Sequence, residues 1–122
     1  MTRILIVDDE LQILELLDLS MTQYGFAVTT ANSGPEAVQL LRSGRFDVVI
    51  LDVLMSPWDG FETARHMRSL PGCPPIIFLS GVSGLAEQQR GLSLGAAFLS
   101  KPFRPSRLSE IIWQVLDEKT AL

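Results

Sequence analysis

Five polar side chains with potential for chemistry stand at or just after the ends of short apolar segments in this chain. They are three carboxylates, one hydroxyl and one amine: Asp8, Asp9, Asp52, Ser80 and Lys101. Carboxylates brought close together repel one another, and a hard divalent cation such as Mg²⁺ relieves that repulsion through oxygen ligands. Each residue alone has an ordinary explanation, such as helix capping by Asp9. The joint pattern therefore carries the argument.

The apolar segments are predicted strands of one parallel sheet. They span Arg3–Val7, Phe46–Asp52, Pro75–Leu79 and Ala96–Leu99. The second contains four consecutive apolar residues, three of them β-branched, which is typical of a strand buried on both faces. In open α/β sheets the carboxyl ends of the strands meet at one edge, and ligands bind there. We therefore expect the five polar side chains to share that edge.

Helical patterns separate these strands, which predicts an α/β fold with helices on both faces of the sheet. The first helix is predicted over residues 10–24, with an inner stripe of Leu14, Leu17, Met21 and Tyr24. A short strand at 27–30 and helices near 33–43, 61–70, 83–94 and 105–118 follow. The spacing of Ser33 and Glu36 predicts a capping box. Glycines in and beside the fourth helix lower its propensity, so we expect it to be the most mobile helix.

Length and composition bound the class of protein. We expect one domain over residues 1–122, with 119–122 as a frayed tail or the start of a linker. The formal net charge of −4 argues against direct nucleic-acid binding, and no apolar run reaches the ~18 residues that span a membrane. The chain begins a strand almost at once, unlike a secretion signal. Cys73 is the single cysteine, so no intrachain disulfide forms, and we expect a cytoplasmic protein.

The chain resembles the receiver domains of two-component response regulators. The matching residues are Asp8-Asp9, Asp52 with Met55 and Gly60 after it, Ser80, and Lys101-Pro102-Phe103. The resemblance covers essentially the whole chain and implies a flavodoxin-like (βα)5 doubly wound sheet of order 2-1-3-4-5. One departure concerns the loop after Asp52. The family commonly has Met-Pro there, whereas here Ser56 follows Met55 and Pro57 comes one place later.

The resemblance implies a phosphoryl acceptor with a Mg²⁺ cofactor. Asp52 would be the nucleophile that accepts the phosphoryl group. Direct Mg²⁺ ligands would be Asp9, Asp52 and the backbone carbonyl of Leu54, with Asp8 acting through water. The phosphoryl oxygens would be bound by two further side chains, Ser80 and Lys101.

The resemblance also implies a switch and its partners. Ser80 would move toward the phosphoryl group, and Phe98, at the family's aromatic switch position, would turn into the vacated space. The Lys101–Pro102 bond would be cis. The donor would be a phosphohistidine of a sensor histidine kinase or phosphotransfer domain. The face formed by the predicted helix at 83–94, the strand at 96–99 and the helix at 105–118 would then contact a downstream effector or a second copy of the chain.

Three alternatives to a phosphorylated switch remain at this point. A Mg²⁺-dependent phosphohydrolase of haloacid-dehalogenase type would need Asp-x-Asp after the first strand, whereas Asp8 and Asp9 are adjacent. A degenerate receiver would act only as a binding module. A flavin-binding electron carrier would need a hydroxyl-rich phosphate loop in place of these acids.

The lifetime of the phosphorylated state is a further prediction. In receivers, the residues two places after the nucleophile and after the switch hydroxyl flank the path of the hydrolytic water. These positions are Leu54 and Val82 here. Their apolar side chains offer no hydrogen bond to water and crowd its approach. We therefore expect a long-lived phosphorylated state.

Overall fold

A five-stranded parallel sheet forms the centre of the molecule. The computed structural model describes residues 1–81 and 84–120. The strands are β1 (Arg3–Val7), β2 (Ala27–Ala31), β3 (Val48–Asp52), β4 (Ile76–Ser80) and β5 (Ala97–Ser100). Their order is β2-β1-β3-β4-β5, and all four neighbouring pairs are parallel. The predicted flavodoxin-like fold and strand order are confirmed.

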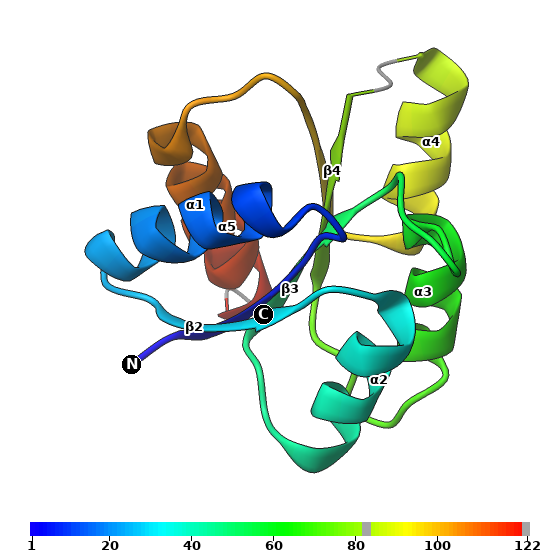
Figure 1. The fold of residues 1–122 in the computed structure, drawn as a ribbon, viewed down its shortest axis with the longest axis horizontal. Helices are drawn as coiled ribbons and strands as arrows, with labels where there is room; N and C mark the ends of the chain where they lie inside the picture. Colours follow the sequence, from blue (N-terminus) through cyan, green and yellow to red (C-terminus); the bar gives the residue numbers. More distant parts are fainter. Residues whose placement is uncertain (82–83, 121–122) are drawn as a thin grey trace.

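Five helices cover the two faces of this sheet (Figure 1). They are α1 (Leu11–Gln23), α2 (Gly34–Ser43), α3 (Gly60–Arg68), α4 (Leu85–Leu94) and α5 (Pro105–Thr120). Helices α1 and α5 pack with Ile4 and Ile6 of β1, whereas α2 and α3 pack with Leu5 and Val7. Successive strand residues point to opposite faces, so one apolar run supplies both cores.

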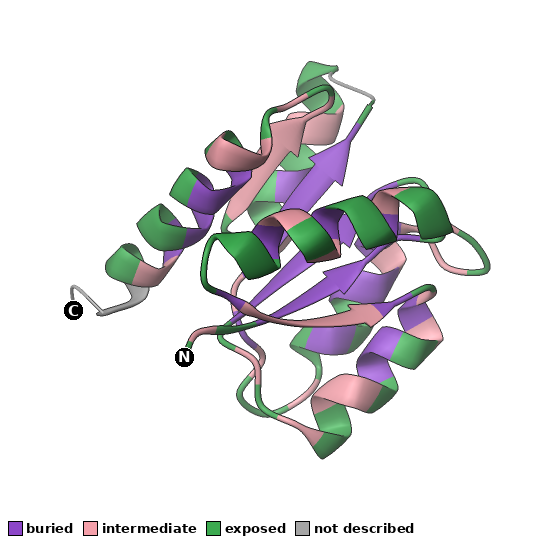
Figure 2. Cartoon of the chain, turned by 60° about the vertical axis from the view of Figure 1, so that its left-hand side comes forward, coloured by how far each residue is buried: buried purple, intermediate pink, exposed green. Residues whose placement is uncertain are grey.

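Burial differs sharply between the middle and the edge of the sheet (Figure 2). Every residue of β3 and β4 is buried, as are the last four residues of β1. All four residues of the edge strand β5 are only half-buried. The side chains that precede Asp52 and Ser80 are therefore held from both faces, while those that precede Lys101 are less enclosed.

Two helices begin at side-chain caps. The Ser33 hydroxyl accepts a hydrogen bond from the Glu36 amide at 3.3 Å, as predicted, and the Glu36 carboxylate accepts from the amide of Asn32 at 3.1 Å. Asp59 caps α3 in the same way and accepts from the Glu62 amide at 2.8 Å. The Asp-x-x-Glu spacing could have predicted this second cap.

Two sequence-based assignments are corrected by the structure. Tyr24 does not belong to the inner stripe of α1, because the helix ends at Gln23 and Tyr24 is 46% exposed as its C-cap. Phe46 and Asp47 precede β3 instead of starting it. The Asp47 carboxylate accepts a hydrogen bond from the Arg3 amide at 2.8 Å, so its side chain holds the segment before β3 beside β1.

Two of the predicted helix termini fall at or next to residues that the structure does not describe. The expected start of the fourth helix at Ser83 lies outside the described residues, and α4 is described from Leu85. Helix α5 is described to Thr120, two residues beyond the predicted end at 118. Residues 121 and 122 lie outside the described part of the chain.

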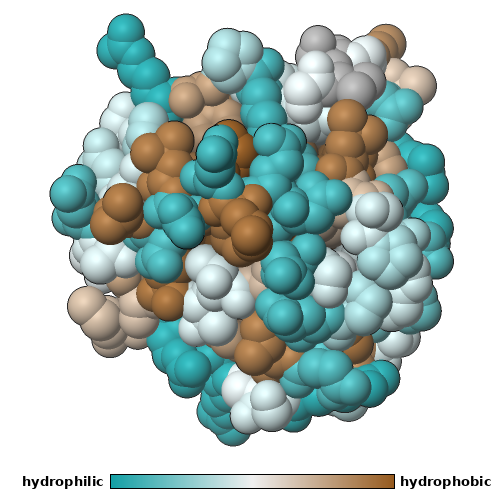
Figure 3. Space-filling model, viewed as in Figure 1, coloured by the Kyte–Doolittle hydropathy of each residue, from teal (hydrophilic) through white to brown (hydrophobic). Residues whose placement is uncertain are grey.

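The outer surface of α1 is unusually apolar. Leu11, Leu16 and Leu19 are each more than half exposed. Hydrophobic groups gather over α1 on the face shown in Figure 3. Within the described residues, no helix combines the length and the apolar character needed to cross a membrane.

Candidate phosphoryl and metal site

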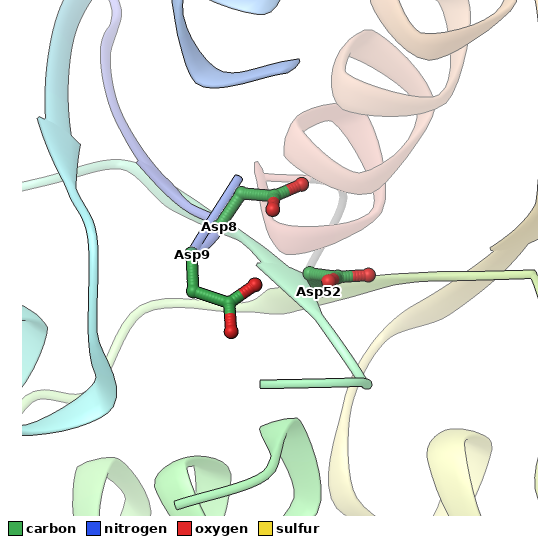
Figure 4. A group of neighbouring side chains, drawn as sticks. All are labelled: Asp8, Asp9 and Asp52. Atoms are coloured by element: carbon green, nitrogen blue, oxygen red, sulfur yellow. The ribbon is translucent and has the colours of Figure 1, made fainter. Parts of the chain in front are cut away.

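Three carboxylates converge at the carboxyl edge of the sheet. Asp8 and Asp9 follow β1 and Asp52 ends β3, and these two strands are neighbours in the sheet (Figure 4). One oxygen from each of the three side chains lies within 4.8 Å of the others. The parallel pairing of β1 and β3 thus places residues 44 positions apart in one acidic pocket.

The pocket encloses two of its carboxylates. Asp8 is 1% and Asp52 3% exposed, whereas Asp9 faces solvent. Asp8 Oδ1 accepts a hydrogen bond from the Glu10 amide at 2.9 Å. The buried Asp8 Oδ2 has no hydrogen-bond partner among the described residues and lies 3.7 Å from the Lys101 ammonium nitrogen. A buried, incompletely satisfied carboxylate oxygen is costly unless a cation completes its shell.

Lys101 reaches the pocket from the end of β5. Its Nζ donates a hydrogen bond to Asp52 Oδ1 at 3.1 Å. Its backbone amide donates to the Ser80 carbonyl at 2.7 Å, which fixes the start of the segment after β5 beside β4. The Lys101–Pro102 bond is cis, as expected. The five predicted site residues therefore come from the ends of four adjacent strands.

Burial and mutual repulsion shift the acidity of the pocket. Burial, followed by the charge of Asp8, raises the pKa of Asp52 to about 6, and the Lys101 ammonium offsets part of that rise. Burial also raises the pKa of Asp8, against the hydrogen bond donated by the Glu10 amide. Both shifts disfavour the charged carboxylates, so the pocket favours binding of a cation.

The donor set fits a magnesium ion. All three converging side chains offer oxygen atoms, and no histidine or cysteine lies among them. Hard cations such as Mg²⁺ prefer oxygen ligands, and Mg²⁺ retains several waters. The unsatisfied Asp8 Oδ2 is a second observation in favour of a cation here.

The loop between β3 and α3 returns tightly to Asp52. A Cβ at Gly60 would clash with the Asp52 carbonyl and lie 2.7 Å from the Cα of Val53, so only glycine fits there. The Gly60 amide donates to the Val53 carbonyl at 2.7 Å. The side chain of Leu54 is 61% exposed.

The departure at Ser56 has a structural counterpart. The Ser56–Pro57 bond is cis, like the Lys101–Pro102 bond, although no cis bond was expected at this position. The next residue, Trp58, is half-buried and stacks on His66 of α3, with ring centroids 3.9 Å apart. Trp58 also lies against Gly34, where a Cβ would come within 2.9 Å of its ring. The loop is thus fastened to α2 and α3.

Ser80 and Phe98 lie on neighbouring strands beside the acidic pocket. Ser80 is fully buried at the end of β4, and Phe98 is half-buried in β5. Phe98 pairs with Phe78, two residues before Ser80, and Phe98 belongs to the core on the α2 and α3 side. Val82, the expected second flank of the water path, lies outside the described residues.

Fold and site together define a doubly wound α/β protein with an acidic, lysine-containing pocket at the carboxyl edge of its sheet. The family model of the response regulator receiver domain matches residues 4–113. The chain belongs to this family, which serves two-component signalling. The phosphohydrolase and flavin-carrier readings are not favoured.

Similar proteins agree with this membership. The chain is 41% identical over 102 residues to the response regulator MprA of Mycolicibacterium vanbaalenii, covering 83% of this chain and 44% of that protein. It is 38% identical over 115 residues to the probable transcriptional regulator ycf27 of Guillardia theta, covering 93% and 45%. The chain thus spans less than half the length of these curated relatives.

Solved structures show the same fold. The chemotaxis protein CheY4 of Vibrio cholerae superposes with a TM-score of 0.86 and 34% identity, covering 94% of this chain and 98% of that one. The response regulator TrrA of Thermotoga maritima, solved in complex with Mg²⁺ and BeF, gives 0.85 and 33%, covering 94% and 99%.

Proposed function

We propose that Asp52 accepts a phosphoryl group in a Mg²⁺-dependent reaction and that this modification switches the domain between two signalling states. The observation that carries the proposal is the convergence of three carboxylates and the Lys101 ammonium around one buried strand end. The likeness to TrrA, solved with Mg²⁺ and BeF, supports the same site.

The chemistry at Asp52 is a direct displacement. A carboxylate oxygen of Asp52 forms a bond to phosphorus as the phosphorus–nitrogen bond of a phosphohistidine breaks. The departing imidazole keeps the electron pair and takes a proton from solvent. Little else is required of the protein, because positioning and charge neutralisation dominate phosphoryl transfer. In this sense the domain would catalyse its own phosphorylation and later hydrolysis.

Each neighbouring residue has a proposed part in that step. Asp9, Asp52 and the Leu54 carbonyl would hold Mg²⁺, with Asp8 acting through water. The bound metal would neutralise charge on the phosphoryl oxygens. The Lys101 ammonium, now 3.1 Å from Asp52 Oδ1, would move to a phosphoryl oxygen, and the Ser80 hydroxyl would donate to another.

The output follows from the position of Ser80. Movement of its hydroxyl toward the phosphoryl group would free space beside β4, and Phe98 on β5 would turn into that space. Since Phe98 lies next to α4, the surface of α4, β5 and α5 would change. We propose that this surface contacts a downstream effector or a second copy of the chain, and that the donor is a sensor histidine kinase or phosphotransfer domain in the cytoplasm.

Phosphorylation with a small donor tests the proposal. Incubation with acetyl phosphate and Mg²⁺ should add the mass of one phosphoryl group to the intact protein, and removal of Mg²⁺ should prevent the addition. Asp52→Asn should remain unmodified, whereas Asp47→Asn, a change outside the pocket, should be modified like the wild type. Equal modification of Asp52→Asn would refute the assignment. No modification of any form would favour the degenerate receiver that acts only by binding.

A further inference from the structure

Helix α4 lies unusually close to β5 at one residue. A Cβ placed on Gly91 would collide with Cδ2 of the Phe98 ring, and it would lie 3.1 Å from Cε2 of the same ring. It would also lie 3.4 Å from the ring of Phe78 on β4. Gly91 is the buried residue of α4. The Phe98 ring therefore occupies the space that any side chain at position 91 would need.

The same ring lies on the strand that ends beside the acidic pocket. Phe98 pairs with Phe78 across β4 and β5, and the next pair toward the pocket on the same face of the sheet is Ser80 with Ser100. Ser80 is fully buried, so a shift of the Phe98 ring along this face bears directly on the space around the serine. Gly91 thus borders the route by which a change at Ser80 would reach α4.

The carboxyl-terminal part of α4 cannot readily retreat from this contact. A Cβ at Gly95 would meet the Ile76 carbonyl at 2.7 Å, so the end of the helix lies directly on β4. Arg68 Nη1 donates a hydrogen bond to the Leu94 carbonyl at 2.9 Å, and the Arg90 guanidinium lies 4.5 Å from the ring centroid of Phe61. These contacts join α4 to α3 on either side of position 91.

We propose that Gly91 is a positioning residue for Phe98 and couples α4 to the phosphoryl site. The missing side chain at position 91 defines where the Phe98 ring lies, because α4 is held against α3 on either side of this position and its end lies on β4 at Gly95. A methyl group at this position displaces the ring while every side chain of the acidic pocket keeps its chemical identity. The inference deepens the proposed function, because the coupling acts on the switch that phosphorylation of Asp52 would set.

The first test observes the ring in the metal-free protein. With phenylalanine labelled for NMR, Gly91→Ala should shift the Phe98 ring signals, which Phe98→Ala identifies by their loss. Gly84→Ala, at the N-cap of the same helix, is the control, because a Cβ there meets nothing within 4 Å. Unchanged Phe98 signals in Gly91→Ala would overturn the proposal.

The second test measures coupling to the site with beryllofluoride and Mg²⁺ as the phosphoryl mimic. Gly91→Ala should change the calorimetric dissociation constant by about five-fold in the wild-type background. In a Phe98→Ala background the same substitution should change it by less than about two-fold. An equal change in both backgrounds, or none in either, would contradict a role through Phe98.

Two outcomes separate this inference from its premises. If wild-type protein binds no beryllofluoride, the proposed function fails, while the NMR comparison still decides whether Gly91 positions the ring. If Gly91→Ala does not fold, the double variant with Phe98→Ala replaces it. If the double variant folds and Gly91→Ala does not, the clash with the Phe98 ring is the cause of misfolding, as proposed. If neither variant folds, the clash involves other residues and the proposal is overturned.

Discussion

The centre of the sheet and its β5 edge are built differently. Around β1 and β3 the strands are buried on both faces, and α2 and α3 begin at side-chain caps formed by Ser33 and Asp59. Around β5 the strand is half-buried, and α4 begins at Gly84 with no side-chain cap. The first region holds the carboxylates, and the second holds Phe98.

This difference suggests a division of labour between a fixed pocket and a movable surface. Repelling carboxylates stay close only where packing holds their strands, as the burial of Asp8 and Asp52 indicates. A conformational readout needs the opposite, namely few enclosing contacts. The close contacts of Gly91 and Gly95 qualify the prediction that α4 is mobile because of its glycines, since these two glycines let the helix pack tightly.

Removal of Lys101 should have the largest effect on the fixed pocket. Lys101→Met takes away an ammonium that lies 3.1 Å from Asp52 and 3.7 Å from Asp8, and that we expect to stabilise charge during transfer. We predict a fall of about 100-fold in the rate of phosphorylation by acetyl phosphate, comparable to the loss of one electrostatic group in other sites. Arg107→Met, which breaks the exposed pair with Glu110, should leave the rate unchanged. A similar fall in both variants would show that loss of the Lys101 ammonium acts no differently from loss of an exposed surface charge.

The pH dependence of stability should also arise in the pocket. The pKa of Asp52 is about 6 in the folded chain against an ordinary value of 3.8, so the folded state binds the proton more tightly. The stabilisation is full below about pH 4 and is lost as pH rises through about 6, a change on the order of 2–3 kcal/mol. Urea unfolding of metal-free protein should show this fall, which Asp52→Asn should reduce.

Mg²⁺ provides the control for that pH dependence. Because a cation binds the ionised carboxylates, Mg²⁺ should restore stability above pH 6 in the wild type and much less in Asp52→Asn. An identical fall with pH in both proteins would show that Asp52 is not the titrating group.

A pair of glycine substitutions compares the two regions directly. Gly60→Ala places a methyl group against the backbone of Asp52 and Val53, which cannot move aside, and should cost about 2 kcal/mol of unfolding free energy. Gly84→Ala, in open space at the N-cap of α4, should change the unfolding free energy by less than about 1 kcal/mol. Equal losses in urea titrations would mean that the two regions tolerate change alike.

The smallest expected effect is a change in fluorescence. Trp58 lies in the loop after Asp52 and stacks on His66, so reorganisation of that loop should alter its emission. Trp113→Phe removes the other tryptophan, which lies on α5, is 46% exposed and packs against Phe26. Titration of this variant with Mg²⁺ and beryllofluoride should change the signal. If the fluorescence does not change while calorimetry shows binding, the Trp58 loop does not respond to the metal.

Much of the pocket could be predicted because it depends on strand ends. Apolar runs that stop at Asp8, Asp52 and Ser80 place those residues on one edge in any parallel sheet. Local signals were also sufficient for the Ser33 cap. The cap at Asp59 carries a similar local signal, the spacing of Asp59 and Glu62.

Other features depend on contacts between distant segments and had no local signal. Tyr24 fits the helical period but falls just beyond the end of α1. Gly91 has low helix propensity, and its contact with Phe98 depends on the position of β5, which no local signal gives. The stacking of Trp58 on His66 requires the positions of both the loop and α3. Tertiary packing decided each of these cases.

The most direct test of the central claim identifies the phosphorylated atom. Protein phosphorylated with acetyl phosphate and Mg²⁺ can be reduced with borohydride, which converts an acyl phosphate of aspartate to homoserine, and then digested for peptide mass spectrometry. We predict homoserine at position 52 alone, in the peptide that contains β3. Homoserine at position 8 or 9, or a phosphoryl group retained on His66, would contradict Asp52 as the acceptor.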